Sequence, residues 1–290
     1  MSNSSLRTRL EQPSILLAPG VYDGLTAAIA ADAGFEALYL SGAAVAYTRL
    51  GRPDIGLSTA SEMADTMALI ADRVELPVIM DADAGFGNAL NAQRTMQQYE
   101  RAGASALQLE DQLHPKRCGH LRGKQLIAGD EMVGKIKAMV DARRVDTLLI
   151  ARTDAVAVEG FDAALDRADR YVEAGADAVF VEAPSSEADL RRVATHFAGR
   201  VPTLANMVEG GATPIHSAAD LEALGFNIAI FPGGVVRALA HAAGDYYASL
   251  FSTGSNNAFA ERMYDFNGLN AVLGTPEMLA RGERYGEPDR

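Results

Sequence analysis

The stretch Glu173-Ala-Gly-Ala-Asp-Ala-Val-Phe-Val-Glu-Ala183 shows how this 290-residue chain is built. A helical segment ends at Gly175, a short turn follows, and an apolar run then closes on the carboxylate of Glu182. The same sequence motif recurs at Asp32-Ala-Gly-Phe-Glu-Ala-Leu-Tyr-Leu-Ser-Gly42 and at Arg101-Ala-Gly-Ala-Ser-Ala-Leu-Gln-Leu-Glu-Asp111. A helix followed by a buried strand, repeated along the chain, predicts an α/β fold.

Other short apolar runs raise the number of expected strands to eight. They are residues 15–19, 37–41, 77–81, 106–110, 147–153, 178–182, 203–207 and 228–231. Helical segments with start signals lie between them; Thr59 and Glu62, for example, have the spacing of a capping box. Eight apolar strands alternating with helices predict a parallel (β/α)8 TIM barrel, with residues 1–290 forming a single domain.

An open, doubly wound sheet is the alternative to a barrel. The turn after the first expected strand, Pro19-Gly-Val-Tyr-Asp23, lacks the glycine pattern of a dinucleotide-binding fold, which favours the barrel. Residues 238–290 exceed what a barrel needs and carry apolar side chains such as Phe259 and Tyr264. We expect them to form a C-terminal helical extension that packs on a neighbouring subunit or over the end of the barrel.

Composition excludes several classes of partner. A formal charge of -12, with no basic tract, argues against binding to nucleic acid or to an anionic membrane surface. No apolar run reaches the roughly 20 residues that span a bilayer, and the N-terminus has no signal-peptide core, so we expect a cytoplasmic protein. The single cysteine, Cys118, excludes an intrachain disulfide.

Polar residues close most of the apolar runs. In a (β/α)8 barrel the active site lies at the carboxyl ends of the strands, so these residues are candidates for it by position. They are Ser41, Gly42, Asp81, Asp83, Glu110, Asp111, Arg152, Thr153, Asp154, Glu182, Asn206, Glu209 and Arg237. A single residue of this kind is about as often a helix cap. The complete ring is better explained by an active site.

Two of these carboxylates, Asp81 and Asp83, are two residues apart and are expected on one side of a strand end. Like charges so close need a counter-charge. Together with Glu110 they offer only oxygen ligands, which favours Mg²⁺, or Mn²⁺, over zinc. The alternative is a pair of solvated turn aspartates that cap the next helix.

Several basic residues are expected around the same rim and predict a small anionic substrate. They are Lys116, Arg117, Arg122, Lys124, Arg152 and Arg237.

The segment Glu110-Asp-Gln-Leu-His-Pro-Lys-Arg-Cys-Gly-His-Leu-Arg-Gly-Lys124 is too long and too polar for a plain connector. Cys118 is flanked there by basic residues, and we expect its pKa to be lowered and the thiol to take part in proton transfer. Gly119 and Gly123 suit a lid that closes over substrate. The alternative is an inert, buried thiol.

At this loop the sequence resembles the isocitrate lyase and phosphoenolpyruvate mutase superfamily, over nearly the whole chain. Lys116-Arg-Cys-Gly-His120 matches the signature of its carbon-carbon lyases. Other blocks match in order: Asp81-Ala-Asp-Ala-Gly-Phe-Gly87, Glu110-Asp-Gln112, Ala151-Arg-Thr-Asp154 and Asn206-Met-Val-Glu-Gly-Gly-Ala-Thr-Pro214. Leu121-Arg-Gly-Lys124 and Val208-Glu-Gly-Gly211 depart from the usual methylisocitrate lyase pattern. They resemble the branch with 2,3-dimethylmalate lyase, petal death protein and carboxyphosphonoenolpyruvate phosphonomutase.

The resemblance implies a barrel whose last helix is exchanged between subunits of a homotetramer. It implies Mg²⁺ held by Asp83, Asp81 and Glu110, with Asp54 nearby. It implies a di- or tricarboxylate substrate held by Ser41, Gly42, Ala43, Gly119, Arg152, Glu182, Asn206 and Arg237.

The implied activity is cleavage of a carbon-carbon bond in a 2-hydroxydicarboxylate, such as a 2-alkylmalate or 2-methylisocitrate, to pyruvate and a smaller carboxylate. Cys118 is then the general acid, supported by Lys116 and His120 of its loop. Tyr39 is the candidate base, although a core aromatic on a strand explains it equally well. A phosphonomutase and an oxaloacetate hydrolase or decarboxylase are the alternatives. A barrel retained only for binding is disfavoured, because both Asp83 and Cys118 are present.

Overall fold

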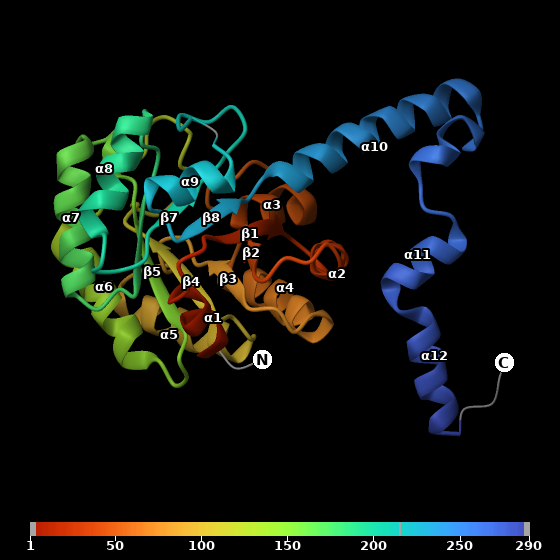
Figure 1. Ribbon diagram of the computed structural model, residues 1–290, viewed down its shortest axis with the longest axis horizontal. Coiled ribbons are helices and arrows are strands. Elements are labelled where there is room, and N and C mark those ends of the chain that lie inside the picture. The colour runs from red at the N-terminus through yellow and green to blue at the C-terminus, as the bar shows by residue number, and fades with distance from the viewer. Residues whose placement is uncertain (1–3, 215, 287–290) are drawn as a thin grey trace. The chain divides into compact units, whose positions relative to one another are not determined.

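In the computed structural model, residues 4–214 and 216–286 are described, and eight parallel strands form their sheet. The strands are β1 (Leu16–Val21), β2 (Leu38–Leu40), β3 (Val78–Asp81), β4 (Ala106–Glu110), β5 (Leu148–Thr153), β6 (Ala178–Val181), β7 (Leu204–Asn206) and β8 (Ile228–Phe231). They pair in the order β6-β5-β4-β3-β2-β1-β8-β7. At the remaining seam Val179 forms a parallel bridge with Thr203, which nearly closes the barrel (Figure 1). The expected TIM barrel is confirmed.

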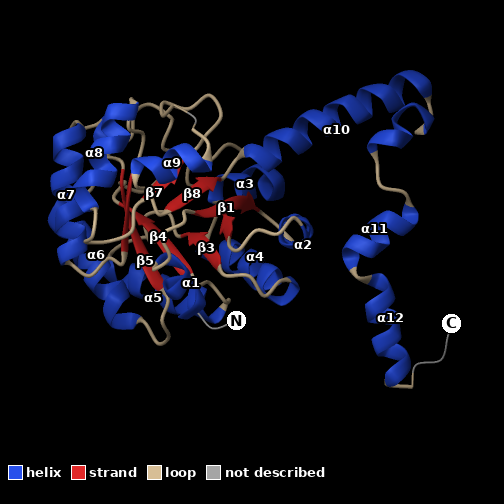
Figure 2. Cartoon of the chain, in the orientation of Figure 1, coloured by secondary structure: helices blue, strands red, loops and turns tan. Residues whose placement is uncertain are grey.

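Helices surround the strands, as Figure 2 shows. They are α2 (Gly24–Asp32), α4 (Ala60–Arg73), α5 (Ala89–Arg101), α6 (Gly129–Ala142), α7 (Phe161–Glu173), α8 (Glu187–Phe197) and α9 (Ala218–Leu224). The expected capping box is present at the start of α4, where Thr59 and Glu62 cap each other's backbone amides. Two short helices were not anticipated from the sequence: α1 (Ser4–Leu10) and α3 (Gly42–Val45), which continues into a π-helical turn at Ala46–Leu50.

Apolar side chains fill the barrel and the layer outside it. One buried cluster includes Tyr39, Ile79, Ile150, Phe180 and Ile230, which come from five different strands. Two larger clusters pack the outer faces of the strands against the surrounding helices. Burial on both faces explains why the strands read as continuous apolar runs in the sequence. The packed core is a rigid base for the polar residues at the carboxyl ends of the strands.

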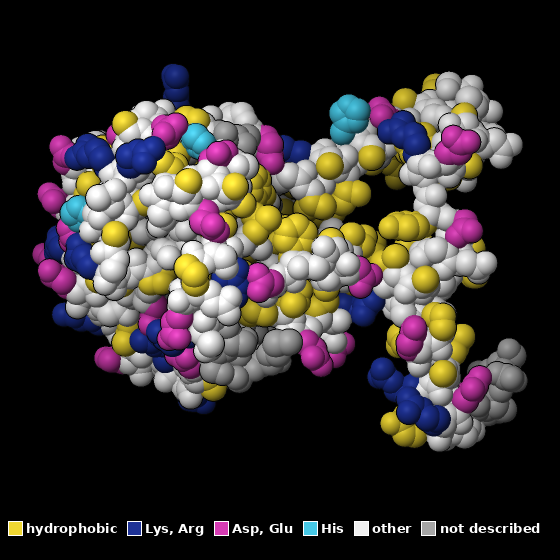
Figure 3. All heavy atoms as spheres, viewed as in Figure 1, with side chains coloured by type: hydrophobic (Ala, Val, Ile, Leu, Met, Phe, Trp, Pro, Cys, Tyr) yellow, Lys and Arg dark blue, Asp and Glu magenta, His cyan; other side chains and the backbone are white. Residues whose placement is uncertain are grey.

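The chain divides into two compact units, Met1–Val235 and Val236–Arg290. The second unit contains most of α10 (Gly234–Thr253), a 3-10 turn at Asn257–Arg262, α11 (Phe266–Leu273) and α12 (Thr275–Arg284). Phe259 is buried within it against the ring of Tyr246, with ring centroids 5.4 Å apart. Many other apolar side chains of this unit are exposed, as Figure 3 shows, and Phe251 is 93% exposed. Among the described helices, none is both long and apolar enough to cross a bilayer.

Candidate active site

The ends of four neighbouring strands supply a row of polar side chains, of which three are buried and that of Asn206 is half-buried. Glu110 ends β4, Arg152 lies near the end of β5, Glu182 follows β6, and Asn206 ends β7. Arg152 Nε lies 3.5 Å from Glu110 Oε2, and Arg152 Nη2 lies 3.5 Å from Glu182 Oε2. The Asn206 amide donates a hydrogen bond to Glu182 Oε2 at 3.1 Å. The structure therefore brings together four residues that the sequence placed at this rim.

A second group of carboxylates lies at the end of β3. The strand stops at Asp81, and Asp83 occupies the following turn with a left-handed φ of 45°. The expectation that both aspartates project from one side of a strand is therefore wrong, because Asp83 is not part of the strand. The turn still joins them, since the Asp83 amide donates to Asp81 Oδ1 at 3.0 Å.

Lys116 is the cation of this second group. Its Nζ lies 2.7 Å from Asp54 Oδ1 and 2.7 Å from Asp83 Oδ1, and its side chain is almost fully buried. Burial raises the pKa of Asp83 to about 6, although Lys116 opposes that rise. Burial alone would lower the pKa of Lys116, but the carboxylates around it, Asp83 foremost, raise it well above its usual value. The ammonium group is therefore charged.

The fit of a divalent cation can be judged from the carboxylates themselves. As the side chains stand, the described residues contain no group of three histidine, cysteine, aspartate or glutamate side chains arranged to hold a metal ion. The available ligands are nevertheless all oxygens, the type that Mg²⁺ prefers. Glu110 Oε1 is buried with no hydrogen-bond partner in the described part of the chain, and burial raises the pKa of Glu110. Uncompensated carboxylate oxygens of this kind fit Mg²⁺ chemically.

Tyr39 is arranged as a hydrogen-bond donor. Its hydroxyl donates to Gln108 Oε1 at 2.8 Å, and Gln108 in turn lies beside Asp81, with Nε2 3.5 Å from Asp81 Oδ1. Complete burial, aided by the charge of Asp81, raises the pKa of Tyr39 well above its usual value. This geometry argues against the expectation that Tyr39 is a base, because a neutral phenol that already donates its proton is a poor proton acceptor.

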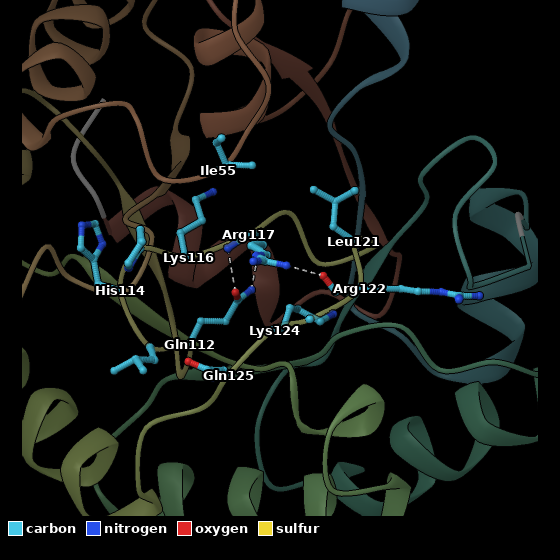
Figure 4. A pocket seen from close by; sticks show the side chains of 12 residues that line it. Ile55, Gln112, His114, Lys116, Arg117, Leu121, Arg122, Lys124 and Gln125 are labelled. Carbon is cyan, nitrogen blue, oxygen red and sulfur yellow. Dashed lines mark hydrogen bonds between the residues drawn. The ribbon is translucent and has the colours of Figure 1, made fainter.

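The cysteine loop is folded down onto the barrel. The Gln112 side chain donates to the Arg117 carbonyl at 2.8 Å and accepts from the Arg117 amide at 2.9 Å, while Arg117 Nη1 donates to the Arg122 carbonyl (Figure 4). A cavity of about 540 Å³ is lined by this loop and Ile55, and no acidic residue is among those lining it. The Cys118 amide donates to the Asp54 carbonyl at 3.1 Å. These bonds hold the loop in a docked form.

Cys118 differs from its expected state. The residue is partly buried, and burial raises the pKa of its thiol, with the charge of Asp54 adding to the rise. The expectation of a lowered pKa is therefore wrong: cations of this loop are bound to carboxylates or to backbone carbonyls, as Lys116 and Arg117 are, instead of to sulfur. Lys124, for example, contacts the Gly119 carbonyl and lies 3.2 Å from Asp154 Oδ1. A protonated thiol suits a proton donor.

Three of the other predicted residues shape the backbone around the site. Ser41 caps α3 by accepting the Ala44 amide at 3.2 Å, and Ala43 is half-buried in that helix. A Cβ on Gly42 would lie 2.9 Å from Asp81 Oδ2, and one on Gly119 would lie 2.8 Å from Glu182. Both positions therefore require glycine for close approach.

Arg237 is the one predicted rim residue outside the barrel unit. It lies in the first turn of α10 and belongs to the C-terminal unit. Its place at the site stays a prediction.

The supporting roles of two residues were not predicted from the sequence. Asp111, taken only as a polar strand end, accepts hydrogen bonds from Thr153 Oγ1 at 2.7 Å, from the Asp154 amide at 2.9 Å and from Tyr171 at 2.8 Å. Lys135 is buried in α6 and donates to the Ala84 carbonyl at 3.0 Å, next to the strained Asp83. A lysine within the apolar stripe of a helix was the available signal for the second residue.

Comparison with known proteins gives the family. The phosphoenolpyruvate phosphomutase family model matches residues 6–251. The chain is 42% identical over 283 residues to the 2,3-dimethylmalate lyase of Eubacterium barkeri, covering 97% of each chain. It is 47% identical over 259 residues to the 2-methylisocitrate lyase of Aeropyrum pernix, covering 89% of this chain and 83% of that relative.

Solved structures agree with these relatives. A crystal structure of 2,3-dimethylmalate lyase, described as a PEP mutase/isocitrate lyase superfamily member, has a TM-score of 0.94 and 39% identity, covering 99% of this chain and 96% of that one. A phosphonopyruvate hydrolase in complex with oxalate and Mg²⁺ has a TM-score of 0.89 and 30% identity, covering 99% and 100%. The resemblance inferred from the sequence motifs is confirmed: the chain belongs to the phosphoenolpyruvate phosphomutase family, within the PEP mutase/isocitrate lyase superfamily.

Proposed function

We propose that the protein is a Mg²⁺-dependent lyase that cleaves a 2-hydroxydicarboxylate, of the 2,3-dimethylmalate or 2-methylisocitrate type, to pyruvate and a smaller carboxylate. The observation that carries this proposal is the docked loop: Gly119, the residue after Cys118, lies against the side chains of Arg152 and Glu182, which places the partly buried thiol at the carboxyl ends of the strands. The names of the two relatives support this class of substrate.

The charge balance of the site supports a divalent cation. Six carboxylates face three cations there: Asp54, Asp81, Asp83, Glu110, Asp154 and Glu182 against Lys116, Lys124 and Arg152. A dianionic substrate cannot enter such a site favourably unless positive charge is added. Asp81, Asp83 and Glu110 would hold Mg²⁺, which would supply that charge and, when bound, would acidify the substrate hydroxyl. The Mg²⁺ in the related phosphonopyruvate hydrolase structure agrees with this choice of ion.

The cleavage then balances with one proton removed and one returned. The 2-hydroxyl loses its proton to a base, the bond between C2 and C3 breaks, and a carbonyl forms at C2 to give pyruvate. The electron pair stays on the leaving fragment as a carboxylate-stabilised carbanion, which takes a proton from the Cys118 thiol. Arg152, buried between Glu110 and Glu182, is placed to hold a substrate carboxylate.

Replacement of Cys118 by serine tests the assigned role. The serine hydroxyl is a far weaker acid, so we expect pyruvate release to fall by at least about 100-fold. Oxalate, as a small dicarboxylate probe, should still bind in the presence of Mg²⁺, as measured by calorimetry. Full activity in Cys118→Ser would contradict the role of the thiol, and loss of both oxalate binding and folding would contradict a purely chemical one.

We also propose that the C-terminal unit packs on a neighbouring copy in a homotetramer. Many large apolar side chains of this unit are well exposed in the single chain, which is unfavourable in water. They include Tyr247, Phe251, Tyr264, Phe266, Met278, Leu279 and Tyr285. Light scattering after size-exclusion chromatography should give about four times the 30.7 kDa chain mass. A monomer would contradict the proposal.

A further inference from the structure

His120 of the docked loop contacts a turn from the opposite side of the barrel mouth. The backbone amide of Ala212, after β7, donates a hydrogen bond to His120 Nδ1 at 3.2 Å. A backbone N–H can only donate, so Nδ1 must accept and carries no proton. Burial lowers the pKa of His120, which agrees with a neutral ring. A neutral imidazole whose Nδ1 is an acceptor has its proton on Nε2.

The other edge of the ring faces the candidate active site. His120 Nε2 lies 3.3 Å from Glu182 Oε1, without the geometry of a hydrogen bond. Within the described residues neither of these buried atoms has another hydrogen-bond partner. Glu182 Oε2, in contrast, already accepts from Asn206. An Nε2–H donor and a carboxylate acceptor are thus left side by side and uncommitted, which marks a place for a ligand that offers both an acceptor and a donor.

Gly211 makes room for the ring. A Cβ at this position would lie 2.7 Å from His120 Cε1 and 2.8 Å from Nδ1, closer than atoms can approach. The Gly211 amide donates to the Val208 carbonyl at 2.9 Å, which closes the turn. The neighbouring Gly210 has a left-handed φ of 74°, but a Cβ there would meet no other atom within 4 Å. Only Gly211 is therefore required by the contact with His120.

We propose that the turn formed by residues 208–212 fixes His120 as the Nε2–H tautomer when the loop is docked, so that His120 is a hydrogen-bond donor to a substrate oxygen. Gly211 and the Ala212 amide are the positioning groups of this device. His120 is then no general base, because one ring nitrogen carries the proton and the other is bound to Ala212. The identity of the substrate oxygen, a carboxylate or the 2-hydroxyl, rests on the proposed lyase function; the tautomer does not.

Nuclear magnetic resonance of the imidazole nitrogens tests the tautomer directly. The full-length protein would be labelled with ¹⁵N-histidine in a deuterated background and studied with Mg²⁺ and oxalate, and His120 assigned through the variant His120→Gln. The two-bond correlation pattern distinguishes a proton on Nε2 from one on Nδ1. We expect the Nε2–H pattern for His120. A proton on Nδ1, or fast averaging between both forms, would overturn the proposal. The measurement needs no turnover, so its failure is distinct from failure of the lyase function.

A matched pair of variants tests the positioning role of Gly211. In Gly211→Ala the new methyl group displaces His120, so the Nε2–H pattern should give way to a mixture of tautomers and kcat should fall. Gly210→Ala introduces backbone strain without touching the ring, and His120 should keep its pattern. An unchanged pattern in Gly211→Ala, in protein shown to be folded by circular dichroism, would overturn the role of this glycine.

Kinetics separate a donor from a base at His120. The side-chain amide of glutamine can place an N–H near the position of Nε2 but accepts protons very poorly. We expect His120→Gln to retain kcat within about tenfold of the wild type, and His120→Ala to lose about 100-fold or more, as for other deleted active-site donors. Equal and severe losses in both variants would indicate a base and overturn the proposal.

Discussion

Lys116 Nζ lies 2.7 Å from Asp83 Oδ1, and this contact joins the cysteine loop to the turn after β3. The same nitrogen lies 2.7 Å from Asp54 Oδ1, so one loop residue neutralises two barrel carboxylates. Docking of the loop therefore depends on the charges that a divalent cation would also neutralise. Loop position and cation binding should be energetically linked in this protein.

Replacing Lys116 with glutamine should reveal this linkage. It leaves Asp54 and Asp83 buried without their cation, and breaking a buried pair costs about 3–5 kcal/mol. We expect a lower Tm and a larger rise of Tm on adding Mg²⁺ than in the wild type, as measured by calorimetry. Arg122→Gln, at an exposed site of the same loop, is the control. An equal Mg²⁺ response in Lys116→Gln and the wild type would contradict the linkage.

Gln112 should control how firmly the loop is docked. Its side chain makes two hydrogen bonds to the backbone of Arg117, each contributing about 0.5–1.5 kcal/mol. In Gln112→Ala we expect faster amide hydrogen exchange across residues 115–124 and a several-fold lower kcat/KM. Gln125→Ala is the matched control, because Gln125 is exposed and contacts Leu113 through its carbonyl. Equal exchange in both variants would show that Gln112 does not hold the loop.

Asp111 should matter for stability and for substrate affinity. In Asp111→Asn an amide NH₂ group replaces one carboxylate oxygen. This NH₂ donor would face hydroxyl groups that already donate to Asp111, including those of Thr153 and Tyr171. We expect a loss of about 2–4 kcal/mol in the free energy of unfolding in urea and a higher KM, because the end of β5 positions Arg152. Asp141→Asn, at an exposed position of α6, should change neither. A wild-type KM in the Asp111 variant would separate this network from Arg152.

The pH dependence of the rate should identify the proton donor. Burial raises the pKa of Cys118, so the thiol keeps its proton throughout the neutral range. A general acid is active below its pKa, and the alkaline fall of the kcat profile should therefore lie above about pH 8.5, the ordinary pKa of cysteine. Measurement of kcat from about pH 6 to about pH 10, a range that brackets this pKa, tests whether the alkaline fall lies there. A fall centred near pH 7 would mean that a lowered cysteine pKa, or another acid, controls the rate.

The repeated αβ sequence motif allowed the barrel to be predicted. Strands that are buried on both faces and alternate with helices that begin at recognisable capping residues are compatible with few other folds. The residues at the strand ends were equally accessible, since their position follows from the fold: Glu110, Arg152, Glu182 and Asn206 lie together as expected. The sequence pattern could not predict which oppositely charged side chain each charged residue of the site contacts.

Pairing between distant segments explains the errors. The basic residues beside Cys118 in sequence suggested a lowered pKa, yet Lys116 is paired with Asp54 and Asp83. Asp83 lies in a left-handed turn, which an alternating strand pattern cannot indicate. The contact of Ala212 with His120 joins residues 92 positions apart through a backbone amide, which has no signature in the side chains.

The central claim, cleavage of a 2-hydroxydicarboxylate, is tested most directly by measuring pyruvate release with and without Mg²⁺. The compounds to compare are 2,3-dimethylmalate, 2-methylisocitrate, isocitrate, citramalate, oxaloacetate and a phosphonate substrate followed by ³¹P NMR. The account predicts stoichiometric pyruvate and a smaller carboxylate from one of the first two, abolished by EDTA and by Cys118→Ser. Turnover of only the phosphonate or oxaloacetate, or cleavage that is unaffected by EDTA, would contradict it.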